Sequence, residues 1–305
     1  MSAAQGREIT RLDDDALRCW PLPSLDDDAD KEARGRVVVI AGSREVPGAA
    51  LLAATAALRA GAGKLVIATV ASAAGAIAIA MPEARVLGLP ETRGGGFDPD
   101  SVRQLEDVIQ TASGVLVGPG MMDGPATVDL MAALAPWLRG RAAVLDAGAM
   151  DVIERLGRFE EPVLLTPHAG EMAHLTGLAK DAIQDDPVQV AREFAHKWNA
   201  VVALKGAQTV IAAPDGQCWM HDGGNAGLAT SGSGDTLAGA IAGLAARGAT
   251  LEQACAWGVV LHARAGDQLA ARLGPVGYLA REIPLEMLAV LRDLQKVEQA
   301  PRRPG

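Results

Sequence analysis

A glycine-rich loop that runs into an apolar segment contains the residues best suited to chemistry. Its glycines are Gly223, Gly224, Gly227, Gly232 and Gly234. The small apolar residues that follow predict a helix over 233–247. The start of such a helix offers unpaired N–H groups and about half a positive charge, and glycines let the backbone approach a ligand closely. We therefore predict an anion site in which Asp235, the one carboxylate at the junction, takes a proton from a hydroxyl group beside a phosphate.

Loops of glycine and polar residues also follow four short β-branched runs. They are residues 42–49, 118–121, 146–149 and 166–171. Because ligands in open α/β sheets collect outside the carboxyl ends of the strands, we expect these loops to converge on one site.

Several polar side chains allow both a functional and a structural interpretation. His168 can bind a ligand or cap a helix, and Glu171 can bind a ligand or stabilise the start of a helix. Lys205, which precedes Gly206, can hold a nucleotide phosphate or ribose, or it can be a solvated hairpin lysine. Asp267 can serve the site from a helix or simply lie at the surface.

The elements that must position these residues alternate between β-branched runs and alanine-rich stretches, which is typical of βαβ units and a parallel sheet. The predicted strands are Val37–Ala41, Leu65–Thr69, Gly114–Val117, Ala143–Asp146, Val163–Leu165, Val201–Leu204, Thr209–Ala213 and Gln217–Met220. The predicted helices are Ala49–Arg59, Pro99–Gln110, Ala126–Leu138, Pro187–Trp198, Ser233–Arg247, Leu251–Leu273 and Pro284–Leu294. A Pro-Asp-Gly turn at 214–216 predicts an antiparallel hairpin at one end of the sheet.

The composition predicts one large domain whose core is built from aliphatic side chains. The chain has 305 residues, 49% of them hydrophobic but only 3% aromatic, and 35 are glycine. Gly239 and Gly243 are expected to bring their helix close to the sheet. We predict an acidic arm over 1–34, a catalytic domain over 35–295 and a polar tail over 296–305, and the arm either wraps on the surface by a few apolar contacts or is a solvated tail.

Charge, cysteine content and hydropathy exclude several classes of protein. A net charge of −9 argues against binding to nucleic acid or to an anionic membrane. The uncharged run 65–82 predicts a buried strand and a buried helix rather than a membrane span. Three cysteines without metal spacing and an N-terminus without an apolar signal region predict a cytoplasmic protein, and no metal ligand is assigned. No complete P-loop or Rossmann fingerprint is present.

Taken together, the motifs are more specific than any one of them. Gly-Ser-Gly-Asp at 232–235, with the stretch 224–230 before it, resembles the nucleotide loop of the ribokinase-like superfamily. With 117–121, 165–172 and 205–209, the chain is similar to the ADP/ATP-dependent NAD(P)H-hydrate dehydratases from Arg36 to Leu294. The resemblance implies a three-layer α/β/α sandwich with a mostly parallel sheet and an antiparallel edge. It also implies repair of hydrated NADH or NADPH, by phosphorylation of the C6 hydroxyl and loss of phosphate.

The resemblance also implies roles for individual residues. ADP or ATP, accompanied by Mg²⁺, would contact Lys205, Gly206, Ala207, Gln208, Thr209, Asn225, Gly227, Thr230, Gly232, Ser233 and Gly234. The hydrated dinucleotide would contact Ala49, Gly120, His168, Gly170, Glu171 and Asp235, with Asp235 as the catalytic base. The alanine-rich faces are compatible with a homo-oligomer.

The chain departs from the family pattern on the substrate side. Gly148 stands where the family has a second aspartate, His174 replaces an arginine, Met122 replaces a glycine, and Asp30-Lys31 replaces a His-Lys pair. An alternative function is a kinase of a sugar or a vitamin-precursor alcohol, and a third is a nucleotide-binding regulatory protein without activity. Thr166-Pro167-His168 favours the dehydratase over the kinase, and retention of Asp235 argues against the regulatory protein.

Overall fold

A ten-stranded sheet forms the centre of the computed structural model, which describes residues 8–24, 31, 32 and 34–295. The strands are β1 (Ile9–Arg11), β2 (Arg36–Ile40), β3 (Lys64–Val70), β4 (Ala84–Leu89), β5 (Gly114–Val117), β6 (Ala142–Leu145), β7 (Val163–Leu165), β8 (Ala200–Leu204), β9 (Thr209–Ala212) and β10 (Cys218–His221). Their order across the sheet is β1-β10-β9-β8-β7-β6-β5-β2-β3-β4. The central strands are buried on both faces, which explains their continuous aliphatic runs.

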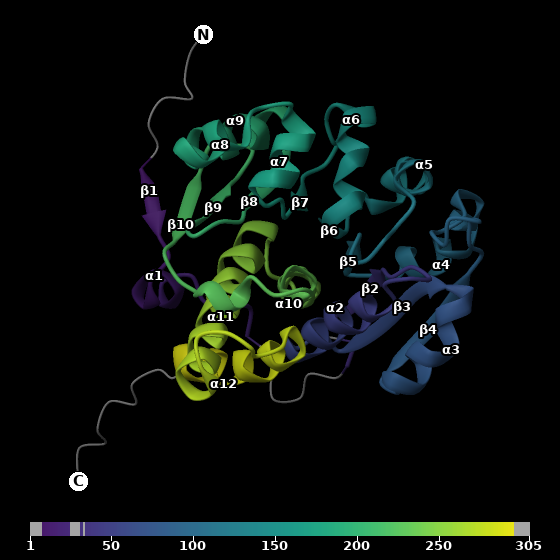
Figure 1. Ribbon diagram of the computed structural model, residues 1–305, viewed down its shortest axis with the longest axis horizontal. Coiled ribbons are helices and arrows are strands. Elements are labelled where there is room, and N and C mark those ends of the chain that lie inside the picture. Colours follow the sequence, from purple (N-terminus) through teal and green to yellow (C-terminus); the bar gives the residue numbers. More distant parts are fainter. Residues whose placement is uncertain (1–7, 25–30, 33, 296–305) are drawn as a thin grey trace.

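Helices cover both faces of this sheet. The α-helices are α1 (Asp14–Arg18), α2 (Gly48–Arg59), α3 (Ala71–Ala80), α4 (Glu106–Gln110), α5 (Gly124–Leu134), α6 (Val152–Leu156), α7 (Ala169–Thr176), α8 (Lys180–Asp185), α9 (Pro187–Trp198), α10 (Ser233–Ala246), α11 (Leu251–Leu273) and α12 (Ile283–Gln295). Figure 1 shows α5 to α9 on one side of the sheet and α2 and α10 to α12 on the other. None of the helices within the described residues is both long and apolar enough to cross a bilayer.

The predicted fold class is confirmed. Every predicted strand is present, with bounds that differ by at most one residue. Neighbouring strands from β7 to β4 are parallel, and β9 runs antiparallel to β8 and β10. The antiparallel pairs lie toward one end of the sheet as expected, although β1 adds a further, parallel strand outside β10.

Some helices differ from the prediction. The stretch Pro99–Gln110 is a 3₁₀ helix to Gln104 followed by the short α4, and α5 changes to a 3₁₀ helix over Ala135–Leu138. The helix predicted as buried after β3 is α3, but only Ala73 and Ile77 of it are buried. It lies at the edge of the sheet over β3 and β4, so one of its faces meets solvent.

Residues 9–22 pack onto the domain rather than extending into solvent. Leu12 and Leu17 are buried, and Trp20 stacks on Trp219 with 5.4 Å between ring centroids. The carbonyl of Trp20 accepts a hydrogen bond of 2.8 Å from Nε1 of Trp257. The boundary between arm and domain at residue 34 stays a prediction, and the predicted tail over 296–305 lies outside the described residues, as do 1–7, 25–30 and 33.

Two glycines set the position of α10, though not in the way the sequence suggested. A Cβ at Gly239 would lie 2.1 Å from the carbonyl oxygen of Ala53, and one at Gly243 would lie 2.4 Å from that of Ala57. These glycines therefore face α2 and not the sheet. Their close contact places the start of α10 beside the start of α2.

Candidate active site

The loops after β2 and β5 meet directly. Gly120 has a φ of +64°, and a Cβ there would lie 2.5 Å from Cβ of Ala49 and 2.7 Å from the carbonyl oxygen of Val46. Only glycine satisfies both the left-handed backbone and the close contact. Two residues predicted to contact substrate, Ala49 and Gly120, are thus brought together.

The start of α10 has the features of an anion site. Gly232 precedes it with a φ of +87°, and no side chain caps the first turn. The Ser233 hydroxyl lies 3.1 Å from Nε2 of the buried His262 on α11, and burial lowers the pKa of His262 to about 4. A neutral imidazole therefore contacts the first turn of α10 through Ser233 and adds no charge to it.

Asp235 lies in the first turn of this helix with its carboxylate free. Among the described residues no side chain donates a hydrogen bond to it or pairs with it, so it can accept a proton from a ligand. Burial and the nearby negative charge of Asp146 raise its pKa to about 6, while the Lys205 ammonium acts in the opposite direction. A carboxyl group in this range is suited to general base catalysis near neutral pH.

Lys205 and Asp146 form a charged pair beside the start of α10. Nζ of Lys205 lies 3.4 Å from Oδ1 of Asp146 and 3.9 Å from Oε2 of Glu171. Asp146 is only 3% exposed and also accepts a hydrogen bond of 2.6 Å from the Thr166 hydroxyl. Burial opposes the charged ammonium, but Asp146 and Glu171 outweigh burial and raise the pKa of Lys205.

His168 and Glu171 form a capping box at the start of α7. Nδ1 of His168 accepts hydrogen bonds from the N–H groups of Gly170 and Glu171, at 3.0 and 3.1 Å. Oε2 of Glu171 accepts one of 2.8 Å from the N–H of His168. The capping interpretation is therefore correct for His168, yet its ring is still half exposed and lines the adjacent cavities.

The loop before α10 is held by two side chains from the last part of the chain. Oδ1 of Asn225 accepts hydrogen bonds of 2.9 Å from the N–H of Gly227 and from the hydroxyl of Tyr278. Nδ2 of Asn225 donates one of 2.9 Å to Oδ1 of Asp267. Asn225 is thus occupied in shaping the loop, and Asp267 fixes the amide of Asn225.

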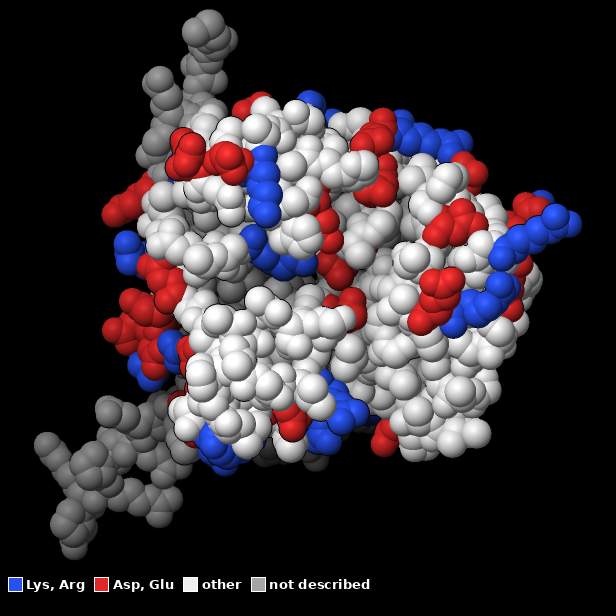
Figure 2. All heavy atoms as spheres, viewed as in Figure 1, with Lys and Arg blue, Asp and Glu red and all other residues white. Residues whose placement is uncertain are grey.

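Two cavities adjoin these residues on one face of the molecule. One of about 640 Å³ is lined by Lys205–Gln208, His168 and α8, and the other, of about 370 Å³, by Gly148, Glu171 and His174 among others. Figure 2 shows a hollow in the middle of this face, with acidic and basic side chains along its walls. Two of the four departures from the family pattern, Gly148 and His174, line the smaller cavity, where His174 lies 3.6 Å from Asp151.

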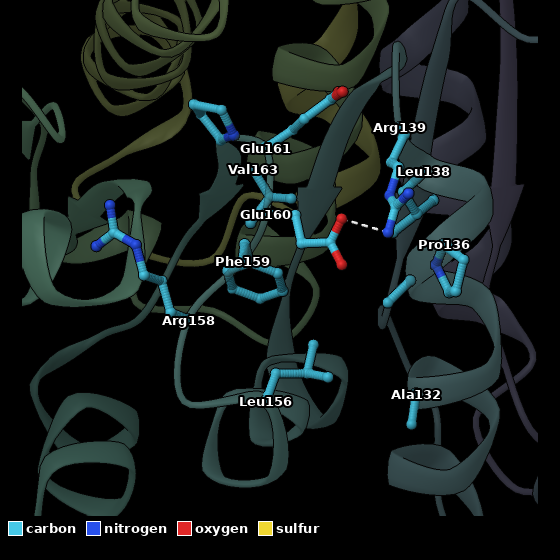
Figure 3. A pocket seen from close by; sticks show the side chains of 12 residues that line it. Ala132, Pro136, Leu138, Arg139, Leu156, Arg158, Phe159, Glu160, Glu161 and Val163 are labelled. Atoms are coloured by element: carbon cyan, nitrogen blue, oxygen red, sulfur yellow. Dashed lines mark ion pairs between the residues drawn. The ribbon is translucent and has the colours of Figure 1, made fainter.

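A third cavity, of about 260 Å³, lies at the opposite end of the strands (Figure 3). Phe159 and Leu138 line it, and Arg139 pairs with Glu160 across it. Arg158 donates its hydrogen bonds to the carbonyl oxygens of residues 196 and 197. Because these charged groups are already paired and none of the predicted site residues is present, this cavity is not part of the site.

Besides the pair of Ala49 and Gly120, the predicted site residues fall into two groups. Lys205, Glu171, His168 and Gly170 adjoin one another at the ends of β7 and β8, and a Cβ at Gly234 would lie 3.5 Å from Nζ of Lys205, which connects this group to α10. Ala207, Gln208 and Thr209 follow along the larger cavity and β9, whereas Asn225, Gly227, Thr230 and Gly232 lie on the separate loop before α10. Asp146 and Thr166 lie in loops that the sequence predicts to converge on the site, but neither was assigned a role there, and Tyr278 was not singled out. Their position directly after buried strands was the signal that marked these two loops.

Comparison with known proteins gives a consistent result. The family model described as NAD(P)H-hydrate dehydratase matches residues 37–287. The chain is 49% identical over 301 residues to an ADP-dependent (S)-NAD(P)H-hydrate dehydratase of Xanthomonas campestris, covering 97% of this chain and 100% of the relative. It is similar in structure to the ADP/ATP-dependent NAD(P)H-hydrate dehydratase of Bacillus subtilis co-crystallised with ATP and Mg²⁺, with a TM-score of 0.81, 30% identity and coverage of 95% of this chain and 100% of that one.

A ribokinase-like superfamily protein of Enterococcus faecalis is also similar, with a TM-score of 0.80, 28% identity and coverage of 94% and 96% of the two chains. The predicted ribokinase-like fold and the predicted family are both confirmed. The free carboxylate at an uncapped helix start, the strand-end loops around it and these similarities agree, and the chain belongs to the NAD(P)H-hydrate dehydratase family.

Proposed function

We propose that this protein is an ADP-dependent dehydratase that returns hydrated NADH or NADPH to the intact dinucleotide. The observation that carries the proposal is the free carboxylate of Asp235, with its pKa raised to about 6, in the first turn of an uncapped helix. A base and an anion site at one point match a hydroxyl group that must lose a proton as it receives a phosphoryl group. ADP is proposed over ATP because the Xanthomonas relative is named as ADP-dependent.

The proposed reaction has two steps. Asp235 takes the proton of the C6 hydroxyl as its oxygen bonds to the terminal phosphorus of the nucleotide, and the bond between that phosphorus and the bridging oxygen breaks. The N–H groups at the start of α10 stabilise the charge on the transferred group. Phosphate then leaves C6 while the adjacent ring carbon loses a proton, which restores the double bond.

Mg²⁺ is proposed to arrive with the nucleotide. No group of three or more potential ligand side chains gathers in the part of the chain that the structure describes. A cation held mainly by phosphate oxygens and water suits this site, as is usual for Mg²⁺ at nucleotide sites. Its chemistry would be to neutralise phosphate charge.

An assay with two nucleotides tests the function. The protein is incubated with hydrated NADH or hydrated NADPH and either ADP or ATP, and the absorbance of the reduced nicotinamide is followed together with released phosphate. We expect one phosphate for each dinucleotide recovered, faster with ADP. No recovery with either nucleotide, together with stable phosphorylation of a sugar or vitamin-precursor alcohol, would favour the kinase instead.

The pH dependence follows from the state of Asp235. Its pKa of about 6 means that the carboxylate is present above pH 6 and is protonated below it. We therefore expect kcat/KM to be level from about pH 7 upward and to fall about tenfold per pH unit below pH 6. A rate profile at constant ionic strength measures this, and a rate that stays level down to pH 4.5 would argue against a base with this pKa.

We also propose that the protein is cytoplasmic and forms homo-oligomers. The three cysteines are free, which suits a reducing compartment. The exposed face of α3 has no charged residue, its Ile79 is 86% exposed, and the neighbouring β4 is an edge strand that a second copy can pair with.

Light scattering tests the assembly. We expect the wild-type mass to be a multiple of 31.4 kDa and Ile79→Glu to move it toward the monomer. Val276→Glu, at another exposed apolar position, should leave the mass unchanged. A monomeric wild-type protein would contradict the proposed homo-oligomer.

A further inference from the structure

Asp146 is a buried carboxylate at the centre of the site to which the proposed reaction gives no role. It follows β6 directly and is 3% exposed. Its side chain has two partners among the described residues, the Thr166 hydroxyl at 2.6 Å and Nζ of Lys205 at 3.4 Å, both on Oδ1. A buried charge is costly unless it is paired, so this carboxylate and the ammonium stabilise each other.

The backbone of Lys205 is fixed while its side chain has a choice of partners. The N–H of Lys205 donates a hydrogen bond of 2.8 Å to the carbonyl oxygen of Pro167. Its ammonium lies among Asp146, Glu171 and the start of α10, close to Gly234. Asp235 is the next residue along that turn, and its carboxylate and the Lys205 ammonium are near enough to shift each other's pKa, so Asp235 is an alternative partner for this ammonium.

The competition matters because the base must be free. An ammonium bonded to Asp235 would occupy the oxygen that receives the proton and would hold the carboxylate in its ionised, weakly basic form. In the structure the ammonium is on Asp146, and Asp235 has no hydrogen-bond partner among the described side chains. Of the other elements packed against α10, α2 contributes alanine at the contact and α11 contributes the neutral His262. The strands β5 and β6 have no charged residue, and the charged groups of the remaining elements include Arg36, which bonds Thr111, Glu282, which accepts from the N–H of Leu279, and Glu286, which pairs with Arg272.

We propose that Asp146 is a positioning residue that anchors the Lys205 ammonium away from Asp235 and so keeps the base free for the substrate hydroxyl. Thr166 holds Asp146 in place, and Glu171 provides a second contact to the Lys205 ammonium. Asp146 has this role only if Asp235 is the base, so the proposal rests on the proposed function.

The test follows the titration of Asp235 directly, in protein without ligands. Aspartate carboxyl carbons are labelled with ¹³C, and the signal of Asp235 is assigned by its absence in Asp235→Asn. In Asp146→Asn we expect the midpoint of this titration to fall by about one pH unit or more, because Lys205 moves to Asp235 and a neighbouring negative charge is lost. Adding Lys205→Met to this variant should return the midpoint to about the wild-type value. The control is Glu154→Gln, which removes an exposed partner of His174 and should not move the midpoint.

The same variants are then assayed for dehydration. We expect Asp146→Asn to lower kcat and to move the acidic limb of the rate profile in the same direction as the titration. A midpoint that is unmoved in folded Asp146→Asn would overturn the proposal, whatever happens to activity. If that variant does not fold, Thr166→Val, which removes the hydrogen bond that holds Asp146 but changes no charge, must lower the midpoint, and an unmoved one overturns the proposal equally.

The titration also separates the two proposals. A wild-type protein that shows no dehydration, while Asp146→Asn shifts the midpoint and Lys205→Met reverses that shift, would contradict the proposed function but retain the anchoring of Lys205.

Discussion

Replacing Asp235 by asparagine is expected to lower the rate of dehydration by about 10²–10⁴-fold, the range for loss of a general base. Asparagine keeps the shape of the side chain but cannot take the proton of the hydroxyl. The N–H groups of the α10 start remain, so the Kd for ADP should change little, and removing a buried negative charge can even tighten it. Single-turnover rates and calorimetric titration with ADP measure the two quantities.

A matched variant controls for the general effect of losing a carboxylate. Asp129, on α5, is an exposed partner of Arg155, and Asp129→Asn removes this ion pair. Exposed ion pairs contribute little to stability. It should keep wild-type rates. If Asp235→Asn retains near-normal turnover, then Asp235 is not the base, and the anchoring role of Asp146 is removed with it.

Replacing Gly239 by alanine is expected to lower the free energy of unfolding by about 3 kcal/mol, at the upper end of the usual cost of overpacking. The new Cβ would lie 2.1 Å from the backbone oxygen of Ala53, which cannot rotate away as a flexible side chain would. α10 must therefore move from α2. Urea unfolding followed by circular dichroism measures the loss.

The matched control is Gly75→Ala, also in the middle of a helix. A Cβ at Gly75 meets nothing within 4 Å. Alanine there should raise stability by about 0.5–1 kcal/mol, because it restricts the unfolded chain and favours the helix. Equal effects of the two substitutions would mean that the packing between α10 and α2 is not what makes glycine necessary.

The candidate site could be predicted only in part. Features that depend on the local sequence could be predicted, and contacts between residues far apart in the chain could not. The loop of Gly120 and the carboxylate of Asp235 could be predicted because a glycine-rich turn after a strand and a carboxylate at a helix start are local patterns. His168 was ambiguous, since a histidine before a helix can cap it or bind a ligand, and the contacts of Nδ1 were needed to show that it caps α7. Asp146 was not assigned, because nothing near it in the sequence marks it as the partner of Lys205, 59 residues away.

Eight of the strands and their alternation with helices were determined by the sequence itself, whereas β1 and β4 were not predicted. Most of these strands are short, continuous and buried aliphatic runs, and this pattern is set within each segment. The glycine-rich approach to Asp235 was determined in the same way, as was the family to which the chain belongs.

Tertiary structure alone decided which distant groups meet. It paired β1 with β10, placed Gly239 against α2 instead of the sheet, and left one face of α3 exposed. It also paired the Lys205 ammonium with Asp146, while the carboxylate of Asp235 has no side-chain partner among the described residues. Each of these depends on burial and on competition between partners far apart in the chain. A residue's type and local spacing do not contain that information, because the energy of a buried charge or a close backbone contact is a property of its neighbours in space.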